Sequence, residues 1–451
     1  MNKLQKKILI FIGILLFIII LIFLKLNNEK NNTINNEVIV NINEITNNSI
    51  VDEERNGEIA YEGPEVINDI KKLKNVKDKT TYFTLDALYQ NFINLIANER
   101  KQELMSVISS KYIKEYNINE SNILNIMKIP KITNNNQYYK IIILDMLTAQ
   151  IDQKTSLYII KGKGRIVGNE DSFEYNIMIE IDEDQGVYSV YPYKYLKDKG
   201  YDKLKEGSII NYTANNIIKN ENNEFVYNLK DDLEMAKKYF SNYAELLAYY
   251  KEEAYSKLNS KYIEKKFSNK QSFYNYLDKI KYTIYTMQIN EYRVYSTQEY
   301  TDYICTDQYN NYYIFRQQDG IMNYTVYLDL YTTELDSIKE YYIKANDETK
   351  LVIQIGKFNQ MLNTKDYDAI YNKLNKTFKE NNFSSVEKLE SYLKTNTYEI
   401  NTISIEETAI QEEYYICSCV LTNQLNKEQS KKINVVLKLV DSNNFEISFS
   451  I

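Results

Sequence analysis

The sequence contains no histidine and no tryptophan, and its 451 residues include only three prolines, eleven glycines and three cysteines. Without histidine, the chain lacks the usual acid–base catalyst near neutral pH and the commonest nitrogen ligand for metals. Ser-His and Cys-His catalytic centres and zinc sites with histidine ligands are therefore excluded. Since no other catalytic motif is found, we expect no catalytic, cofactor-binding or metal-binding residues, and hence no enzyme.

The three cysteines, Cys305, Cys417 and Cys419, form no CxxC pair. Cys417 and Cys419 lie two residues apart in a strand-like run, so they point to the same face of the strand and are poorly placed to bridge each other. A free cysteine usually behaves as a small core residue. The pattern predicts three buried thiols rather than a redox pair.

Acidic residues exceed basic ones, 62 to 55, for a net charge of -7. Proteins that bind nucleic acid concentrate lysine and arginine against the phosphates. The opposite balance here argues against nucleic acid as a partner.

Residues 8–24 form an uncharged apolar run, and Leu26 extends it beyond Lys25. A helix of this length just spans the hydrocarbon core of a bilayer. The run predicts a transmembrane signal anchor over residues 8–26, embedded in the lipid bilayer through residues such as Ile8, Leu16 and Leu24. A cleaved signal peptide is the alternative, but the run exceeds a typical signal-peptide core and no small-x-small cleavage site follows it.

Lys3, Lys6 and Lys7 lie in the short tail before this run. Basic residues beside a membrane helix favour the cytoplasmic side. We therefore expect residues 1–7 to form a cytoplasmic tail in a single-pass protein of the cell membrane, with the bulk of the chain extracellular. Residues 27–79 are rich in asparagine and poor in aromatic periodicity, which predicts a flexible tether.

One amphipathic phrase occurs twice. Residues 255–277 (YSKLNSKYIEKKFSNKQSFYNYL) align without a gap on residues 371–393 (YNKLNKTFKENNFSSVEKLESYL), with identity at 9 of 23 positions. A weaker third copy, residues 105–127, places Ile108 on Leu258 and Leu374. Further along, Cys305 and Cys417 come into register after a small gap. Such repetition predicts that the chain builds one structural unit three times.

Each copy has the same order of expected elements: a long amphipathic helix, a second helix leading through the repeated phrase into a short third one, and then strands in hairpin order. This order predicts an α+β fold with three tandem domains of helices and antiparallel sheet. We assign them to residues 80–210, 230–335 and 345–451.

On this element order and the repeated phrase, the units resemble the nuclear transport factor two-like, or cystatin-like, cone. The resemblance covers residues 82–451 and implies a bent antiparallel sheet that wraps the long helix, closed by two shorter helices. The whole layout resembles membrane-anchored tandem cone-domain proteins of low-GC Gram-positive bacteria. It is also similar to conjugation-channel proteins with one anchor and tandem cones, although those generally have two cones and we expect three in this chain.

Some proteins with this cone are isomerases or dehydratases that use Asp, His or Tyr inside it, and an Asp base with a Tyr donor needs no His. Tyr303, Tyr313 and Asp329 fall on expected strands of the second unit and would be the candidates. Because tyrosine is abundant, occurring 44 times, their convergence would be coincidental, and a packed core is favoured.

Three other motifs have plainer structural interpretations. DEDQG, residues 182–186, lacks the acidic residue at the twelfth position of a calcium loop, so it predicts a hairpin turn. KGKGRIVG, residues 161–168, lacks the ending of a phosphate-binding loop and lies in a strand-turn context. Asp231 and Asp232 predict the start of a helix.

Two functions remain open. The first is an anchored, extracytoplasmic interaction or scaffold protein that docks onto an envelope protein or onto a second copy of itself. The second is a small-ligand receptor, or a lyase- or isomerase-like enzyme, that uses the interior of one cone. Large apolar residues persist at equivalent positions in the second and third copies, which favours the first function.

Overall fold

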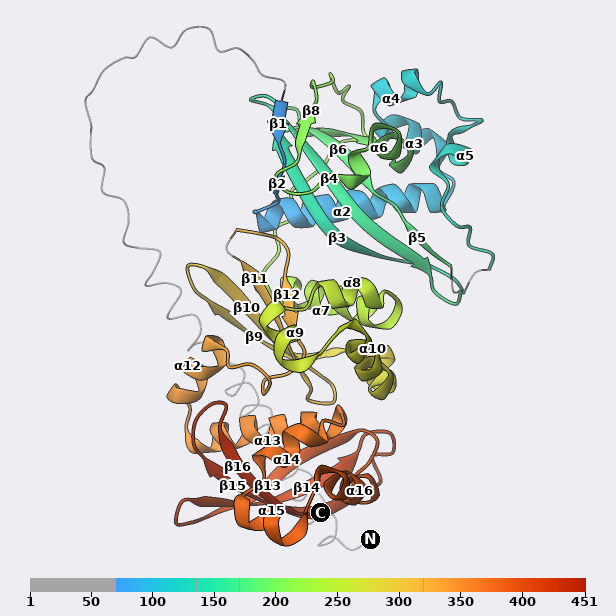
Figure 1. Cartoon of the computed structure of the whole chain (residues 1–451). Coiled ribbons are helices and arrows are strands. Elements are labelled where there is room, and N and C mark those ends of the chain that lie inside the picture. Colours follow the sequence, from blue (N-terminus) through green and yellow to red (C-terminus); the bar gives the residue numbers. More distant parts are fainter. Residues whose placement is uncertain (1–69, 135, 170, 319) are drawn as a thin grey trace, which may run out of the picture. The chain divides into compact units, whose positions relative to one another are not determined.

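The computed structural model of the chain describes residues 70–134, 136–169, 171–318 and 320–451 (Figure 1). These residues form a compact α+β unit with several antiparallel sheets, which confirms the expected fold class. The predicted anchor, cytoplasmic tail and most of the tether lie outside the described residues. Within the described residues, no helix combines the length and the apolar character needed to cross a membrane.

The first module begins earlier than expected, within the predicted tether. Strand β1 (Ile70–Lys72) pairs with β8 (Ile209–Asn211), and β2 (Lys74–Asn75) pairs with β3 (Tyr139–Gln150). Leu73 and Val76 are buried between and after these strands, which fixes a segment that otherwise looks polar and irregular. The expectation of a tether through residue 79 is therefore wrong for residues 70–79.

The main sheet of this module has the strand order β2-β3-β4-β6-β7, with β5 paired to β4. Its other strands are β4 (Thr155–Ile166), β5 (Ser172–Glu174), β6 (Ile177–Asp182) and β7 (Val187–Tyr191). Its helices are α2 (Lys79–Ala97), α3 (Lys101–Val107), α4 (Ser110–Glu115), α5 (Ile123–Met127), α6 (Tyr193–Lys199) and the 3-10 turn η1 (Tyr201–Lys203).

The second module contains a four-stranded sheet with the order β12-β11-β10-β9. Its strands are β9 (Ile289–Ser296), β10 (Tyr300–Asp307), β11 (Tyr312–Gln318) and β12 (Thr325–Tyr327). Its helices are α7 (Asp232–Tyr249), α8 (Lys251–Ser256), α9 (Ser260–Lys266), α10 (Lys270–Lys279) and α11 (Lys281–Thr286), followed by α12 (Asp336–Lys344). The side chain of Asp231 accepts a hydrogen bond from the backbone N–H of Glu234 and caps α7, as expected for a helix start.

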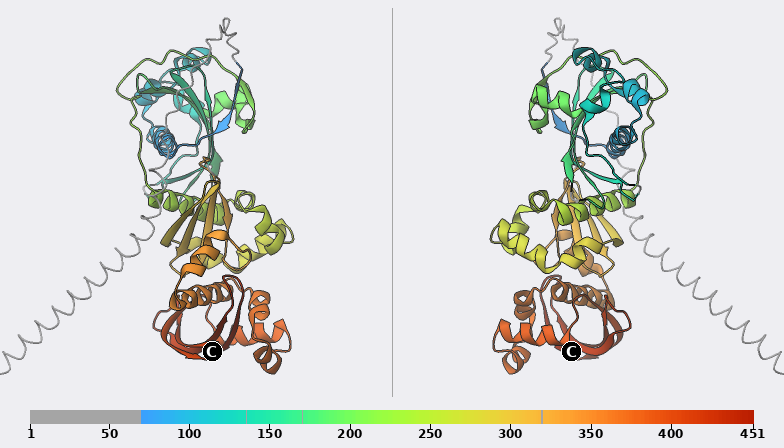
Figure 2. Two further views of the ribbon diagram at one scale, coloured as in Figure 1. Left: turned by 90° about the vertical axis from the view of Figure 1, so that its left-hand side faces the viewer. Right: turned by 90° about the vertical axis from the view of Figure 1, so that its right-hand side faces the viewer.

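The third module repeats the plan with the strand order β13-β14-β15-β16. Its strands are β13 (Asn401–Gln411), β14 (Tyr414–Asn423), β15 (Ser430–Leu439) and β16 (Phe445–Ser450). Its helices are α13 (Asp347–Asn363), α14 (Tyr367–Lys373), α15 (Lys376–Asn382) and α16 (Val386–Asn396). Figure 2 shows this sheet curving around α13.

A short parallel bridge recurs at the aligned position of each copy. Ile108 bridges Val190, Leu258 bridges Val326 and Leu374 bridges Ile447. The next residue in each copy donates its backbone N–H to the same partner strand, at 2.9, 3.1 and 2.9 Å respectively. At this corner of each copy, the second helix ends against a strand of its own sheet.

A bulge also recurs in the first long strand of each sheet. The register shifts between Ile143 and Asp145, opposite Thr306 and Asp307 in the second module, and between Ile405 and Glu407. A bulge bends its strand and increases the local twist. These bends curve each sheet toward the long helix that packs on it.

The concave side of each sheet is occupied by its own side chains. In the second module Tyr239 of α7 packs its ring at 5.6 Å from that of Tyr303 and at 4.6 Å from that of Tyr324. In the third, the rings of Phe358 and Phe449 stack at 5.3 Å. Cys305 and Cys417 are fully buried and occupy equivalent positions, opposite Tyr292 and Thr408, and Cys419 is buried near Cys417 in β14. The expectation of buried thiols is confirmed.

Candidate functional site

The residues proposed as a catalytic group do not converge. Tyr303 donates its hydroxyl to Asp232 at 3.3 Å, whereas Tyr313 donates to Asp307 at 3.1 Å. Asp329 does not lie on a strand, because β12 ends two residues before it. Each of the three side chains therefore belongs to a different polar cluster, and they do not form a catalytic site together.

Asp329 instead belongs to a buried ion cluster that joins the second and third modules. Lys266, at the end of α9, pairs with Asp366, which caps α14, and lies 3.4 Å from Asp329. The exposed fractions of the three side chains are 10%, 20% and 1%. Tyr262 donates its hydroxyl to Asp329 at 2.7 Å, and Tyr331 donates to Asp366 at 3.1 Å.

The charges in this cluster stabilise one another. Burial lowers the pKa of Lys266, but Asp329 and Asp366 outweigh it, so that the net pKa lies above its ordinary value. Burial conversely raises the pKa of Asp366, and Lys266 outweighs that effect, leaving this pKa below its ordinary value. The cluster is thus held as an ion pair at neutral pH.

Helix α13 carries a second set of buried contacts to the second module. Gln360 donates to the backbone oxygens of Leu328 at 2.8 Å and Tyr312 at 3.1 Å, and Asn359 donates to that of Tyr309 at 3.2 Å. Gly356 completes this face, because a Cβ there would lie 3.2 Å from the Tyr312 ring. The side-chain amides of Asn359 and Gln360 thus pack against the second module instead of facing water. The spacing of apolar residues in the sequence does not predict this burial. We call this face and the Lys266 cluster the α13 joint.

The first and second modules meet through ion pairs. Arg165 of β4 pairs with Glu245 of α7, and Lys140 adds a contact of 3.1 Å to the same carboxylate. The Arg165 guanidinium also lies over the Tyr249 ring, 3.5 Å from its centroid. Only 2% of the Glu245 side chain is exposed, so this carboxylate depends on its two cationic partners.

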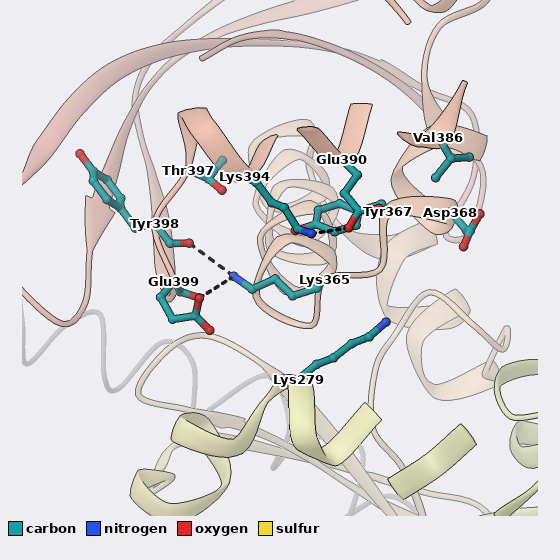
Figure 3. Close-up of a pocket in the computed structure, with 10 residues that line it drawn as sticks. All are labelled: Lys279, Lys365, Tyr367, Asp368, Val386, Glu390, Lys394, Thr397, Tyr398 and Glu399. Carbon is teal, nitrogen blue, oxygen red and sulfur yellow. Dashed lines mark hydrogen bonds and ion pairs between the residues drawn. The ribbon is translucent and has the colours of Figure 1, made fainter. Parts of the chain in front are cut away.

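A groove of about 470 Å³ lies at the edge of the α13 joint (Figure 3). Lys279 of α10 reaches toward it from the second module, and the third module supplies the remaining walls. Those walls are formed by Lys365, Tyr367, Asp368, Val386, Glu390, Lys394, Thr397, Tyr398 and Glu399. The groove is therefore lined by helix ends and loops rather than by the concave face of a sheet.

The groove holds three lysines and three carboxylates, so it presents no strong field of one sign. Lys365 donates to the backbone oxygen of Glu399 at 2.8 Å, and Lys394 pairs with Glu390 at 2.6 Å. Burial lowers the pKa of Lys365, with Glu399 opposing the shift. Two of the three ammonium groups thus already have partners, and the arrangement contains no nucleophile–base pair for catalysis.

The remaining sequence motifs lie where expected. Residues 182–186 form the turn between β6 and β7, closed by the pairing of Asp182 with Val187. Residues 161–166 belong to β4, in a strand and not in a phosphate-binding loop. The predicted anchor residues Ile8, Leu16 and Leu24 and the topology residues Lys3, Lys6 and Lys7 fall outside the described residues.

Comparison with protein-family models found no match, and a search of curated proteins found no significant similarity.

Proposed function

We propose that the chain is a single-pass, membrane-anchored extracytoplasmic scaffold without catalytic activity. In this proposal residues 8–26 hold it in the bilayer, the tether lifts the folded part away, and the outer surfaces of the modules dock onto an envelope protein or onto a second copy. We further propose that the modules are diverged cones of the nuclear transport factor two-like type, which the recurring bulge and the long helix packed on each sheet support.

The observation that carries this proposal is the occupied interior of the second and third modules. Proteins that bind small ligands in a cone keep an open, partly polar interior. Here the second module fills this space with Tyr239, Tyr303 and Phe315, all fully buried. The third fills it with Phe358 and stacked neighbours. The outer surfaces are then the part of the molecule left to make contacts.

The α13 joint supports the scaffold role in a second way. Interfaces between the domains of one chain are usually modest, and relative motion is the default. A joint with a buried ion cluster and buried amides instead favours one arrangement, since moving the modules would leave those groups without partners. Such a joint presents two modules as a single surface.

The test is capture of the full chain from detergent-solubilised membranes of its own host, with chemical crosslinking before lysis. We expect either one stoichiometric envelope protein or a specific homo-oligomer. Recovery of a strict monomer with no stoichiometric partner would count against the scaffold proposal. A second variant, with Lys279→Glu and Lys394→Glu, alters the groove while leaving the interiors of the modules intact. Loss of the partner in this variant would locate docking at the groove.

The alternative of a small-ligand receptor has the groove as its supporting observation. The groove lies outside the sheet interiors and its charges are balanced, so it supports this alternative less than an open cone would.

A further inference from the structure

Strand β9 forms an open edge of the second sheet. It is the last strand in the order β12-β11-β10-β9, and among the described residues β10 is the only strand that pairs with it (Figure 1). An edge strand presents a row of unpaired backbone groups on which another chain can add a strand. The side chains of residues 290–293 are all exposed, so another molecule can reach this edge.

The backbone groups on the open side of β9 follow from the hairpin that joins it to β10. The N–H of Thr297 donates to the backbone oxygen of Tyr300 at 2.8 Å, so these residues form a hydrogen-bonded pair. Along an antiparallel strand, residues alternately direct their N–H and C=O groups toward the neighbouring strand and away from it. Counting back from Thr297, Tyr292 and Val294 direct these groups toward the open side.

The first module shows the equivalent edge covered by another strand. The recurring bulge aligns β3 of the first sheet with β9 of the second. Strand β2 pairs with Leu147 and Thr148 of β3. Counted from the bulge, these two residues correspond to Arg293 and Val294 of β9. The fold therefore accepts an added strand at this position, and in the second module no described segment supplies one.

The charges on β9 indicate which molecule fits this edge. Glu291 and Arg293 lie two residues apart, so both point to the same face of the sheet. Among the described residues neither charge has an ion-pair partner, and the Arg293 guanidinium lies over the Tyr341 ring, 4.3 Å from its centroid. A strand that places a positive charge opposite Glu291 and a negative charge opposite Arg293 would satisfy both.

A second copy of β9 is such a strand. In an antiparallel pair with a two-fold axis at Tyr292, each Glu291 lies directly opposite Arg293 of the second copy. Because Tyr292 directs its N–H and C=O groups toward the open side, the two Tyr292 residues would form a hydrogen-bonded pair. The two pairs of Glu291 with Arg293 then occupy the adjacent positions without hydrogen bonds, where side chains lie closest together.

We propose that two copies of the chain associate through antiparallel pairing of their β9 strands around Tyr292. This inference rests on the proposed scaffold function and assigns a second copy as the occupant of one surface. If the proposed anchor holds both copies in one membrane, it raises their effective concentration for this pairing. The equivalent strand of the third module does not fit its own copy in this way, because β13 carries Glu406 and Glu407 and no basic residue.

The test uses two differently tagged full chains, co-expressed in the host membrane and purified in detergent. We expect wild-type copies to be captured together and to sediment as a dimer. Glu291→Arg and Arg293→Glu should each weaken self-association by about tenfold, because either change turns both ion pairs into contacts between like charges. The matched control is Glu407→Arg, at an exposed position of β13, which should leave self-association unchanged. Circular dichroism establishes that each variant is folded.

The two single variants also test the register. When Glu291→Arg is mixed with Arg293→Glu, both contacts again place an arginine opposite a glutamate. The two variants should therefore be captured together at the wild-type level, although neither associates with itself. The double variant, Glu291→Arg with Arg293→Glu, should self-associate for the same reason. A merely structural defect at either position would not be rescued by mixing.

Three results overturn the proposal. They are a wild-type chain that sediments as a monomer, self-association that neither single variant weakens, and a loss in both single variants that mixing does not restore. These results are distinguishable from failure of the scaffold proposal. A monomer that still captures one stoichiometric envelope protein overturns the β9 pairing alone, whereas a monomer without any stoichiometric partner counts against both.

Discussion

Replacing Lys266 with methionine tests whether the α13 joint holds the second and third modules together. The substitution keeps most of the apolar stem but removes the only cation that contacts both Asp329 and Asp366 among the described residues. Removing one partner from a buried ion cluster costs about 3–5 kcal/mol, because the remaining charges are left without compensation. We expect a loss in the free energy of unfolding of this order.

The variant should also change the sign of the pH dependence. In the wild type the lowered pKa of Asp366 contributes stability that is present above its ordinary pKa and is lost as the pH falls. In Lys266→Met two unpaired carboxylates face each other, so one of them should bind a proton more readily than in the unfolded chain. The variant should therefore become more stable, relative to wild type, as the pH falls.

The assay is urea unfolding of the full chain in detergent, followed by tyrosine fluorescence and by limited proteolysis between the modules. The matched control is Lys394→Met, which breaks the exposed Lys394–Glu390 pair, whose side chains are 62% and 36% exposed. Such surface pairs contribute at most about 1 kcal/mol. A loss for Lys266→Met no greater than that of the control would refute the reasoning.

Three further predictions concern other parts of the fold. Gly162→Ala should destabilise the first module by about 1–3 kcal/mol in thermal unfolding, because the new Cβ would lie 2.1 Å from the Tyr89 hydroxyl oxygen, and Tyr89→Phe should restore part of the loss. Burial raises the pKa of Asp307 to about 6, so its contribution to stability is full below its ordinary pKa and is lost as the pH rises through 6. Asp307→Asn should remove a fall on the order of 3 kcal/mol between pH 4 and 7 in urea unfolding, and an unchanged pH profile would count against this. Cys305, Cys417 and Cys419 should react with a thiol reagent only after denaturation, since all three are buried; rapid reaction of the native chain would contradict the described core.

The sequence was sufficient to predict the repeated helical corner. Leu258 and Leu374 share a phrase whose apolar spacing specifies a buried helix face, and both make the same bridge to a strand. The weaker copy at Ile108 makes that bridge as well, and Ile108 is buried there like Leu258 and Leu374.

The first strands of the second and third sheets have little signal in the sequence. Most residues of β9 and of the second half of β13 are exposed or only partly buried, so neither strand has the alternation of apolar and polar residues that identifies a half-buried strand. Edge strands of this kind are fixed by pairing with a neighbour rather than by burial.

The α13 joint was missed because its residues are polar. Gln360 and Asn359 look like the solvent face of an amphipathic helix, and only the presence of another module explains their burial. The proposed group of Tyr303, Tyr313 and Asp329 failed for a related reason, because each side chain had a nearer carboxylate or amine that the sequence could not place.

We propose that the folded part lies on the extracellular side of the cell membrane, and cysteine labelling in intact cells tests this most directly. Lys427→Cys places a thiol in the exposed turn between β14 and β15, and the three natural cysteines are buried. We predict that a membrane-impermeant maleimide labels Lys427→Cys in intact cells. Asn2→Cys, in the expected cytoplasmic tail, should be labelled only after permeabilisation. Protection of Lys427→Cys until the cells are permeabilised would contradict the account.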